Sequence, residues 1–140
     1  MEIKVHKLYD NTCLPKYAHP GDAGMDVFSR ENHLLQPGER HTFELGFNAE
    51  LPNGYVALVW DKSGLAHKQG IHSLAGVIDA GYRGEYVAIL FNSGQYPYQI
   101  KQGDKIAQIL IQAVEQANIV TVDDINTTDR SDGRYGSSGR

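Results

Sequence analysis

The most regular alternation of apolar and polar residues runs from His41 to Leu51. After His41, the odd-numbered positions of this stretch hold apolar side chains, among them those of Phe43, Leu45, Phe47 and Ala49. A period of two places these side chains on one face of a β-strand, whereas the same spacing would scatter them around a helix. We therefore predict a half-buried strand over residues 41–51.

Five further apolar runs also predict strands. Tyr55–Trp60 and Tyr86–Phe91 are rich in β-branched and aromatic residues, so we expect both to be covered on two faces. Ile106–Val114 is long enough for a helix, but its β-branched residues and the Gly103-Asp104 turn before it favour a strand. Shorter strands are expected near the ends, at Glu2–Leu8 and Ile119–Val122.

Turn-forming residues separate these runs at short intervals, as at Pro37-Gly38 and Pro52-Asn53-Gly54. Many short strands with frequent turns predict an all-β sandwich or barrel and exclude a βαβ protein. The single helix we expect is one or two turns long, around Ser63–Lys68. Residues 1–125 are assigned to one β-barrel domain. Residues 126–140 lack apolar periodicity, and we expect them to form a C-terminal tail that is mobile without a ligand.

Composition and charge narrow the function classes. The 140 residues are 41% hydrophobic and 21% charged, enough to bury a core without a disulfide or a structural metal. The net charge of −4 argues against stable nucleic-acid binding, which needs a basic face. Cys13 is the only cysteine, which excludes an internal disulfide and a cysteine-based zinc site. Because no membrane-spanning run or signal peptide is evident, we expect a cytoplasmic protein with no membrane partner.

Two loops carry residues suited to phosphate and metal chemistry. Asp22 and Asp26 flank Gly24, and two such carboxylates can hold a hydrated divalent cation, although these residues by themselves favour a turn with solvated acids. In Asp61–Ala66 a strand breaks into a short helix beside a hydroxyl and an ammonium group. Such a helix start attracts phosphate oxygens, and the alternative is that Ser63 is a plain N-cap.

Two further segments hold isolated polar groups. One apolar run ends at Asp79, and a glycine-flanked turn with Tyr82 leads into the next strand. Two strands joined in this way would leave a pocket with a backbone edge and the Tyr82 ring as its floor, although a lone aspartate there is commonly a turn residue. Gln108 lies on an otherwise apolar strand and needs hydrogen-bond partners, which could be structural or catalytic.

Taken in order, these segments resemble the homotrimeric deoxyuridine triphosphatases (dUTP diphosphatases). All five motifs of that family have counterparts, namely Ala23-Gly24-Met25-Asp26, Lys62–Ala66, Gly76–Asp79 with Tyr82-Arg83-Gly84, Gly103–Gln108 and Arg130–Gly139. The resemblance implies a jelly-roll-like β-barrel, assembled as a homotrimer whose active sites lie between subunits. It also implies Mg²⁺-dependent hydrolysis of dUTP to dUMP and pyrophosphate, which keeps uracil out of DNA and supplies the precursor of thymidylate.

The resemblance assigns a role to each matching position. Asp79 would be the general base that activates the water attacking the α-phosphorus, and Gln108 would position that water or the phosphate. Asp26 would hold Mg²⁺ through the waters of the ion. The remaining residues would bind substrate: Lys62, Ser63 and Gly64 the phosphates, the backbone of Gly76, Val77 and Ile78 the uracil, Tyr82 the deoxyribose, Arg130 the γ-phosphate, Tyr135 the uracil face, and Gly136, Ser137 and Ser138 the phosphates.

The sequence departs from the family pattern at Lys62, where arginine is usual, and Asp61 beside it could pair with this lysine. Two alternatives to a dUTP diphosphatase stay open. A dCTP deaminase shares the fold, but Ile89 occupies the position where deamination needs a glutamate. A nucleotide-binding regulatory protein of the same fold would be expected to have lost Asp79 or Asp26, and both are present.

Overall fold

The computed structural model describes residues 1–128 and 131–132 of the chain. Over that part it contains eleven strands and one helix, and all paired strands run antiparallel. A four-stranded sheet has the order β2 (Met25–Phe28), β11 (Lys105–Ala113), β6 (Tyr55–Trp60) and β8 (Val77–Asp79), and a three-stranded sheet has the order β4 (Arg40–Glu44), β9 (Val87–Asn92) and β7 (Ile71–Leu74). Two pairs complete the fold, β1 (Lys4–Lys7) with β5 (Phe47–Glu50) and β3 (His33–Leu35) with β10 (Tyr98–Ile100).

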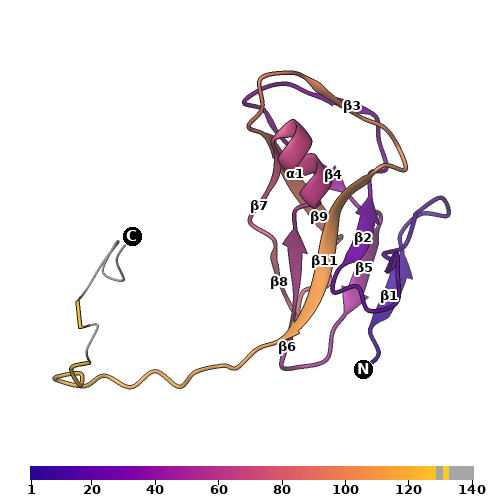
Figure 1. Cartoon of the computed structure of the whole chain (residues 1–140). Coiled ribbons are helices and arrows are strands. Elements are labelled where there is room, and N and C mark those ends of the chain that lie inside the picture. The colour runs from indigo at the N-terminus through magenta and orange to yellow at the C-terminus, as the bar shows by residue number, and fades with distance from the viewer. Residues whose placement is uncertain (129–130, 133–140) are drawn as a thin grey trace.

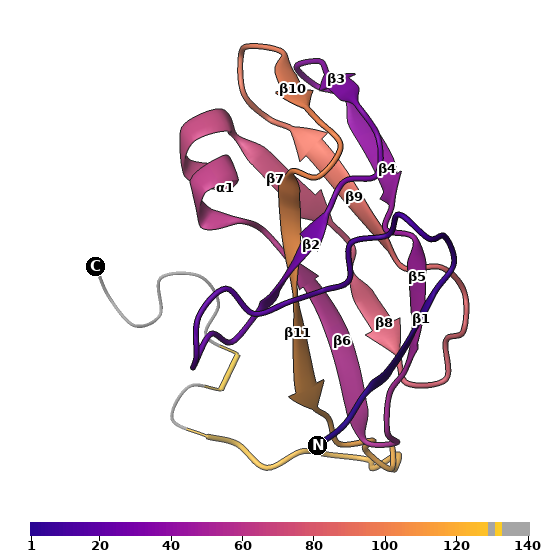
Figure 2. The same ribbon diagram turned by 90° about the vertical axis from the view of Figure 1, so that its right-hand side faces the viewer.

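The two larger sheets lie one behind the other, and the smaller pairs extend them at the ends (Figures 1 and 2). Their inward-facing side chains form one apolar core, with Leu35, Phe43, Ala57, Ala88 and Ile100 among its most deeply buried members. The short helix α1 (Ser63–Gln69) connects β6 to β7 and contacts β7. The architecture is the all-β, jelly-roll-like barrel with one short helix that the sequence predicted. Within the described residues, no helix has the length and apolar character to cross a membrane.

The regular alternation over 41–51 gives two strands, not one. Its apolar parity is buried as predicted, since Phe43, Leu45, Phe47 and Ala49 are each no more than 5% exposed. The chain nevertheless breaks at Gly46, which has a φ of +79°. Before this glycine β4 pairs with β9, and after it β5 pairs with β1. A change of partner strand therefore interrupts a strand whose hydrophobic pattern is continuous.

Three of the denser runs form strands where they were predicted. β6 matches its predicted bounds, β9 and β11 differ from theirs by one residue at each end, and α1 exceeds its predicted range by one residue. The prediction that β9 is covered on both faces was too strong. Its side chains alternate between buried and half-buried, so the single chain covers one face fully and the other in part.

The strand predicted at Ile119–Val122 was wrong. The chain leaves the sheets after Ala113, and residues 114–128 run away from the barrel (Figure 1). Ile119 is 92% exposed and Val120 is 69% exposed, and no strand within residues 1–128 or 131–132 pairs with them. Residues with high β-propensity do not form a strand unless a second strand lies alongside to share backbone hydrogen bonds.

Candidate active site

Residues of three predicted motifs line one pocket of about 280 Å³. β2 contributes Asp26, the start of α1 contributes Lys62, Ser63 and Gly64, and β11 contributes Gln108. The sheet register explains this meeting, because Gln108 lies opposite Asp26 on one side and opposite Trp60, which directly precedes the helical segment, on the other. The predicted phosphate and metal residues are therefore adjacent within one chain. We call this space the polar pocket.

Asp26 is the electrostatic centre of the polar pocket. It is only 3% exposed, and its Oδ1 lies 2.5 Å from Lys62 Nζ while its Oδ2 lies 2.7 Å from Lys105 Nζ. Burial raises the pKa of this carboxyl, but the hydrogen bonds and charges of Lys105 and Lys62 outweigh burial, so the net pKa is below its ordinary value. Asp26 is thus a carboxylate that holds two ammonium groups beside the pocket.

Gln108 has the hydrogen-bond partner that its position on an apolar strand required. Its Nε2 donates to the backbone carbonyl of Asp61 at 2.8 Å. A Cβ at Gly24 would lie 2.2 Å from Gln108 Oε1, so glycine leaves room for the amide in this rotamer. The hydrogen bond to Asp61, just after the end of β6, gives Gln108 a defined orientation at the pocket.

The start of α1 differs from the simple N-cap alternative. Lys62, not Ser63, is the capping residue, and its side chain makes no capping hydrogen bond. Ser63 is the first helical residue and is exposed at the polar pocket, together with Gly64. The hydroxyl and the first-turn N–H groups therefore remain available to a ligand. The pairing of Asp61 with Lys62 that the sequence allowed is absent, because Asp61 binds His72 and Ser73 and Lys62 binds Asp26.

The third predicted motif lines a second cavity of about 250 Å³, which we call the apolar pocket. Gly76, Val77, Ile78, Asp79 and Tyr82 all belong to its wall. The sequence suggested that the strands on either side of the Tyr82 turn are directly joined neighbours. In the structure these two strands do not pair with each other. β8 pairs with β6 in one sheet and β9 pairs with β4 and β7 in the other, so the cavity lies where the two sheets separate.

A strained backbone segment allows β8 to cross between the sheets. Ala75 has a φ of +59° and Gly76 has a φ of +106°. The carbonyl of Gly76 accepts a hydrogen bond from Val59 N at 2.8 Å, and a Cβ at Gly76 would lie 2.8 Å from Val59 O. Only a glycine can approach β6 this closely in this conformation.

Aromatic rings form the far side of the apolar pocket. The Tyr82 ring is 46% exposed, and its hydroxyl donates to the carbonyl of Glu85 at 3.1 Å. Its centroid lies 6.1 Å from that of Tyr86, which is almost fully buried. Tyr82 N also donates to the carbonyl of Asp79 at 3.0 Å, which closes the turn. The partly exposed Tyr82 ring therefore lies beside the exposed carboxylate of Asp79. Its flat face offers a surface on which a sugar ring could pack.

The two pockets lie apart on one chain. They share no lining residue. Asp79 is opposite Val56 of β6, whereas Gln108 of β11 is opposite Trp60, four residues further along β6. Four residues along the sheet and two strands across it separate the two Cα atoms by roughly 16 Å. The side chains of Asp79 and Gln108 in the same chain cannot reach the same reacting atom.

Sequence reasoning missed Lys105, which does not line the polar pocket but forms an ion pair with Asp26 of its wall. Its motif was recognised, but a β-bulge between Lys105 and Ala107 shifts the pairing of β11 with β2, and the sequence gave no sign of that shift. The tail residues predicted to contact the substrate, Arg130, Tyr135, Gly136, Ser137 and Ser138, lie outside the described residues.

The fold and site place the chain among jelly-roll-like β-barrel proteins that carry an apolar pocket of about 250 Å³ and a separate polar pocket lined by Asp22, Asp26 and Lys62. The sequence model of the dUTPase family matches residues 10–139. A deoxyuridine 5′-triphosphate nucleotidohydrolase of Thermobifida fusca is 42% identical over 142 residues, covering 99% of this chain and 79% of the relative. The chain therefore belongs to the dUTPase family.

Solved structures agree with this assignment. The dUTPase of Staphylococcus bacteriophage 80alpha with dUPNHPP superposes with a TM-score of 0.92 at 27% identity, covering 99% of both chains. It is described among phage dUTPases that control transfer of virulence genes by a proto-oncogenic G protein-like mechanism. A dUTPase mutant from phage phi11 of S. aureus, with a structural Mg(II) ion, gives a TM-score of 0.84 at 27% identity and covers 91% of this chain and all of its own.

Proposed function

We propose that this chain hydrolyses dUTP to dUMP and pyrophosphate by in-line attack of water on the α-phosphorus. The observation that carries the proposal is the pair of pockets, one apolar with a carboxylate at its rim and one with lysines beside a fixed amide. A nucleoside fits the first pocket and a triphosphate fits the second, and the family is one of dUTP hydrolases. Its activity would keep uracil out of DNA and supply dUMP for thymidylate synthesis.

The backbone of β8 supports recognition of the base. β8 is the edge strand of its sheet and pairs only with β6 among the described residues, so its outer N–H and C=O groups are free. Uracil presents an acceptor, a donor and an acceptor along one edge. The backbone of Gly76, Val77 and Ile78 can match that pattern, with Tyr82 beneath the deoxyribose.

Asp79 is proposed as the general base that deprotonates the attacking water. Its side chain is exposed at the rim of the apolar pocket, next to the tyrosine that would hold the sugar. Replacing it with asparagine, Asp79→Asn, keeps the shape but removes the proton acceptor. We expect the rate of dUTP hydrolysis to fall by about 10²–10⁴-fold with an unchanged circular dichroism spectrum.

The polar pocket is proposed to bind the phosphates. Lys62 and Lys105 supply positive charge, Ser63 and Gly64 supply the hydroxyl and N–H groups, and Gln108 positions the water or the α-phosphate. Lysine in place of the usual arginine gives a point charge without a bidentate contact.

The donor set of the polar pocket fits Mg²⁺ as a partner of the substrate. Both oxygens of Asp26 already contact ammonium groups, so this carboxylate would meet the waters of an ion chelated by the triphosphate, as would Asp22 at the same pocket. The ion would neutralise charge that develops on the phosphates during the displacement. Asp26 and the lysines it holds keep the pocket ordered for that complex.

We further propose a homotrimer in which subunits share active sites. The two pockets of one chain are too far apart to complete one site, and a second copy can bring its polar pocket to the first copy's Asp79. The segment 114–128 also carries exposed apolar side chains, those of Ile119, Val120, Val122 and Ile125, which a neighbouring copy would cover. In this assembly the tail residues Arg130 and Tyr135 would close over the substrate. We place the enzyme in the cytoplasm.

The decisive experiment measures pyrophosphate release from dUTP, dTTP, dCTP and UTP, with and without Mg²⁺. Hydrolysis confined to dUTP and dependent on Mg²⁺ is the expected result. Release of ammonia from dCTP would instead favour the deaminase alternative. That outcome is not expected, because Ile89, which lines the apolar pocket, cannot transfer a proton. Nucleotide binding without turnover would favour a regulatory protein.

A further inference from the structure

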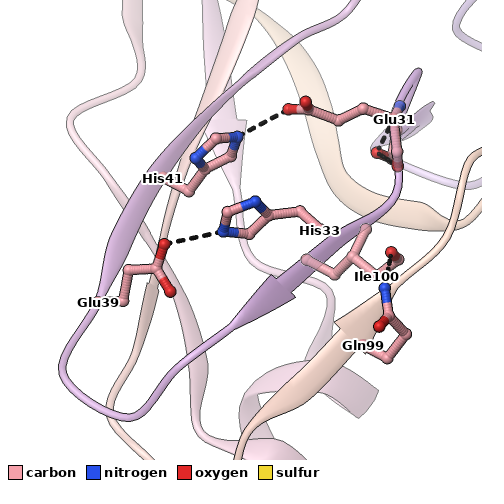
Figure 3. A network of polar contacts seen from close by, with 7 residues as sticks. Glu31, His33, Glu39, His41, Gln99 and Ile100 are labelled. Carbon is pink, nitrogen blue, oxygen red and sulfur yellow. Dashed lines mark hydrogen bonds and ion pairs between the residues drawn. The ribbon is translucent and has the colours of Figure 1, made fainter.

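Two histidine rings and two glutamates from residues 31–41, on and beside β3 and β4, meet at one place, and none of them lines the apolar or the polar pocket (Figure 3). His33 of β3 and His41 of β4 stack with ring centroids 3.7 Å apart and planes inclined by 13°. The fully buried ring of Phe43 meets His33 edge-on at 5.9 Å and His41 at 4.7 Å. A core side chain therefore fixes the place of both imidazoles.

Each histidine has a carboxylate of its own. Glu39 Oε1 lies 2.8 Å from His33 Nε2, and Glu31 Oε1 lies 2.7 Å from His41 Nε2 (Figure 3). The other oxygen of Glu39 accepts a hydrogen bond from the backbone N–H of Gln36 at 2.7 Å. Because the backbone N–H of Gln36 holds Oε2 of Glu39, Oε1 of Glu39 stays directed toward the imidazole of His33.

His33, Glu39 and His41 each offer one ligand atom, and these atoms lie within 4.8 Å of one another. Since Nε2 of His41 is bound to Glu31, Nδ1 is the nitrogen of that ring left to bind an ion. A carboxylate on the opposite ring nitrogen is the usual outer partner of a metal-bound histidine, because it fixes the ring and raises its basicity. The three side chains are 25–31% exposed, so an ion can enter from solvent.

We propose that His33, His41 and Glu39 bind a divalent transition-metal ion of the zinc type, with Glu31 as the outer carboxylate of His41. Two imidazoles and one carboxylate suit zinc and its neighbours, whereas Mg²⁺ prefers an all-oxygen shell. A tetrahedral ion with bonds of about 2.0–2.1 Å holds its ligands about 3.4 Å apart. On binding, His33 Nε2 and Glu39 Oε1, which lie 2.8 Å apart, separate slightly, and the stacked imidazole rings rotate out of parallel so that one nitrogen of each faces the ion. Water takes the fourth position, and the ion ties β3, β4 and their connecting turn together.

The test uses the full-length, tag-free protein, freed of metal with a chelator and then dialysed. Zn²⁺ is titrated calorimetrically, and Co²⁺ is followed by its visible d–d absorption. One ion per chain is expected, with no competition from Mg²⁺ at the same concentration. His33→Gln should weaken binding at least tenfold, and Glu31→Gln by about 10–100-fold as an outer-carboxylate variant.

The matched control is His6→Gln, at an exposed histidine of β1 whose side chain forms no hydrogen bond or ion pair among the described residues. It should bind the ion as the unchanged protein does. The proposal is overturned if Zn²⁺ does not saturate at one ion, or if His33→Gln binds like the control. If His33→Gln fails to fold, Glu39→Gln serves instead, since its amide oxygen can still accept the Gln36 N–H, and equal binding by that variant would also overturn the proposal. The unchanged protein should hydrolyse dUTP equally fast with and without Zn²⁺, which keeps this result separate from the proposed function.

Discussion

At the scale of single residues, burial decides what each polar group of the site can do. Asp26 is buried yet charged, because two lysines share its two oxygens. Tyr86 is buried to a similar degree, but its hydroxyl has no hydrogen-bond partner among the described residues. Burial raises the pKa of that hydroxyl, with smaller and opposing effects of Arg83 and Tyr82. Asp26 is thus a paired charge, whereas the Tyr86 hydroxyl is an unpaired polar group. Substituting these two residues should therefore change the free energy of unfolding differently.

Tyr86→Phe should leave the free energy of unfolding unchanged or raise it by about 1 kcal/mol. The substitution removes a buried hydroxyl that makes no hydrogen bond, while the ring still packs 5.2 Å from Phe47. Urea unfolding followed by fluorescence measures the difference. Tyr82→Phe is the control, because its hydroxyl does donate to Glu85, and it should lose about 0.5–1.5 kcal/mol. A loss for Tyr86→Phe as large as for the control would mean that the Tyr86 hydroxyl is bonded.

Asp61 makes stability depend on pH. Burial raises the pKa of this carboxyl, but hydrogen bonds from Ser73 and His72 outweigh burial and bring the net pKa below its ordinary value of 3.8. A lowered folded pKa contributes stability above the unfolded value and loses it as pH falls through the folded value. Asp61→Asn should therefore lower the free energy of unfolding by about 1–3 kcal/mol at pH 7, a difference that shrinks below pH 3.8.

Urea unfolding of both proteins at several pH values between 7 and 3 measures this difference. Asp123→Asn is the control, because Asp123 is exposed and its side chain contacts no partner among the described residues. It should leave stability unchanged across the range. A constant difference between Asp61→Asn and the unchanged protein down to the lowest pH would contradict the linkage.

At the scale of elements, partner changes between strands create the site. β8 leaves the β7 side of the barrel to pair with β6, and the apolar pocket opens where it does so. The backbone of Ala75 and Gly76 makes this crossing possible through two successive positive φ angles. The edge of β8 that we propose to bind the base therefore depends on a glycine, which has no side chain to contact the substrate.

Gly76→Ala should destabilise the protein by about 2–4 kcal/mol and raise the KM for dUTP. The new Cβ would lie 2.8 Å from the backbone oxygen of Val59, in a conformation that side chains rarely adopt. Gly54→Ala is a matched control, since Gly54 has a φ of +82° but nothing within 4 Å of a Cβ. Gly54→Ala should lower the free energy of unfolding only by the cost of a side chain at positive φ, about 1–2 kcal/mol, and leave the KM unchanged. Equal effects of the two substitutions on stability and KM would show that the contact with Val59 is unimportant.

At the scale of the whole molecule, the distance between the pockets bears on the proposed assembly. The β6 residues opposite Asp79 and Gln108 are four positions apart in the same sheet. In the proposed homotrimer, a complete site would combine the Asp79 of one copy with the Gln108 of another. The same proposal gives the exposed 114–128 segment a neighbouring copy to cover it.

Two variants that are each nearly inactive, Asp79→Asn and Gln108→Leu, should restore activity when they are mixed. After unfolding and refolding together in equal amounts, about a quarter of the shared sites would combine two intact halves. Pyrophosphate release should then reach about a quarter of the activity of the unchanged protein. Refolding each variant alone is the control. No recovery on mixing, with trimer mass retained, would mean that each site is built within one chain.

The sequence alone determined the class of fold and the family, and it singled out the residues that we propose for the site. Period-two patterning marked β4 and β5, dense apolar runs marked β6, β9 and β11, and the five ordered motifs carried the family resemblance. These features are local, because a strand's hydrophobic face and a turn's glycine can be read within a few residues. The short strands β3, β7 and β10 left no such pattern, since three or four residues are too few to alternate visibly.

Only the tertiary structure decided which segments meet. The break at Gly46, the crossing of β8 to β6, the pairing of Lys105 with Asp26 and the grouping of His33 with His41 all depend on strand register. Register is set by packing across the whole core, and the sequence near any one strand does not contain it. For the same reason Ile119–Val122 has strand-forming residues but no strand, because backbone hydrogen bonding needs a second segment alongside.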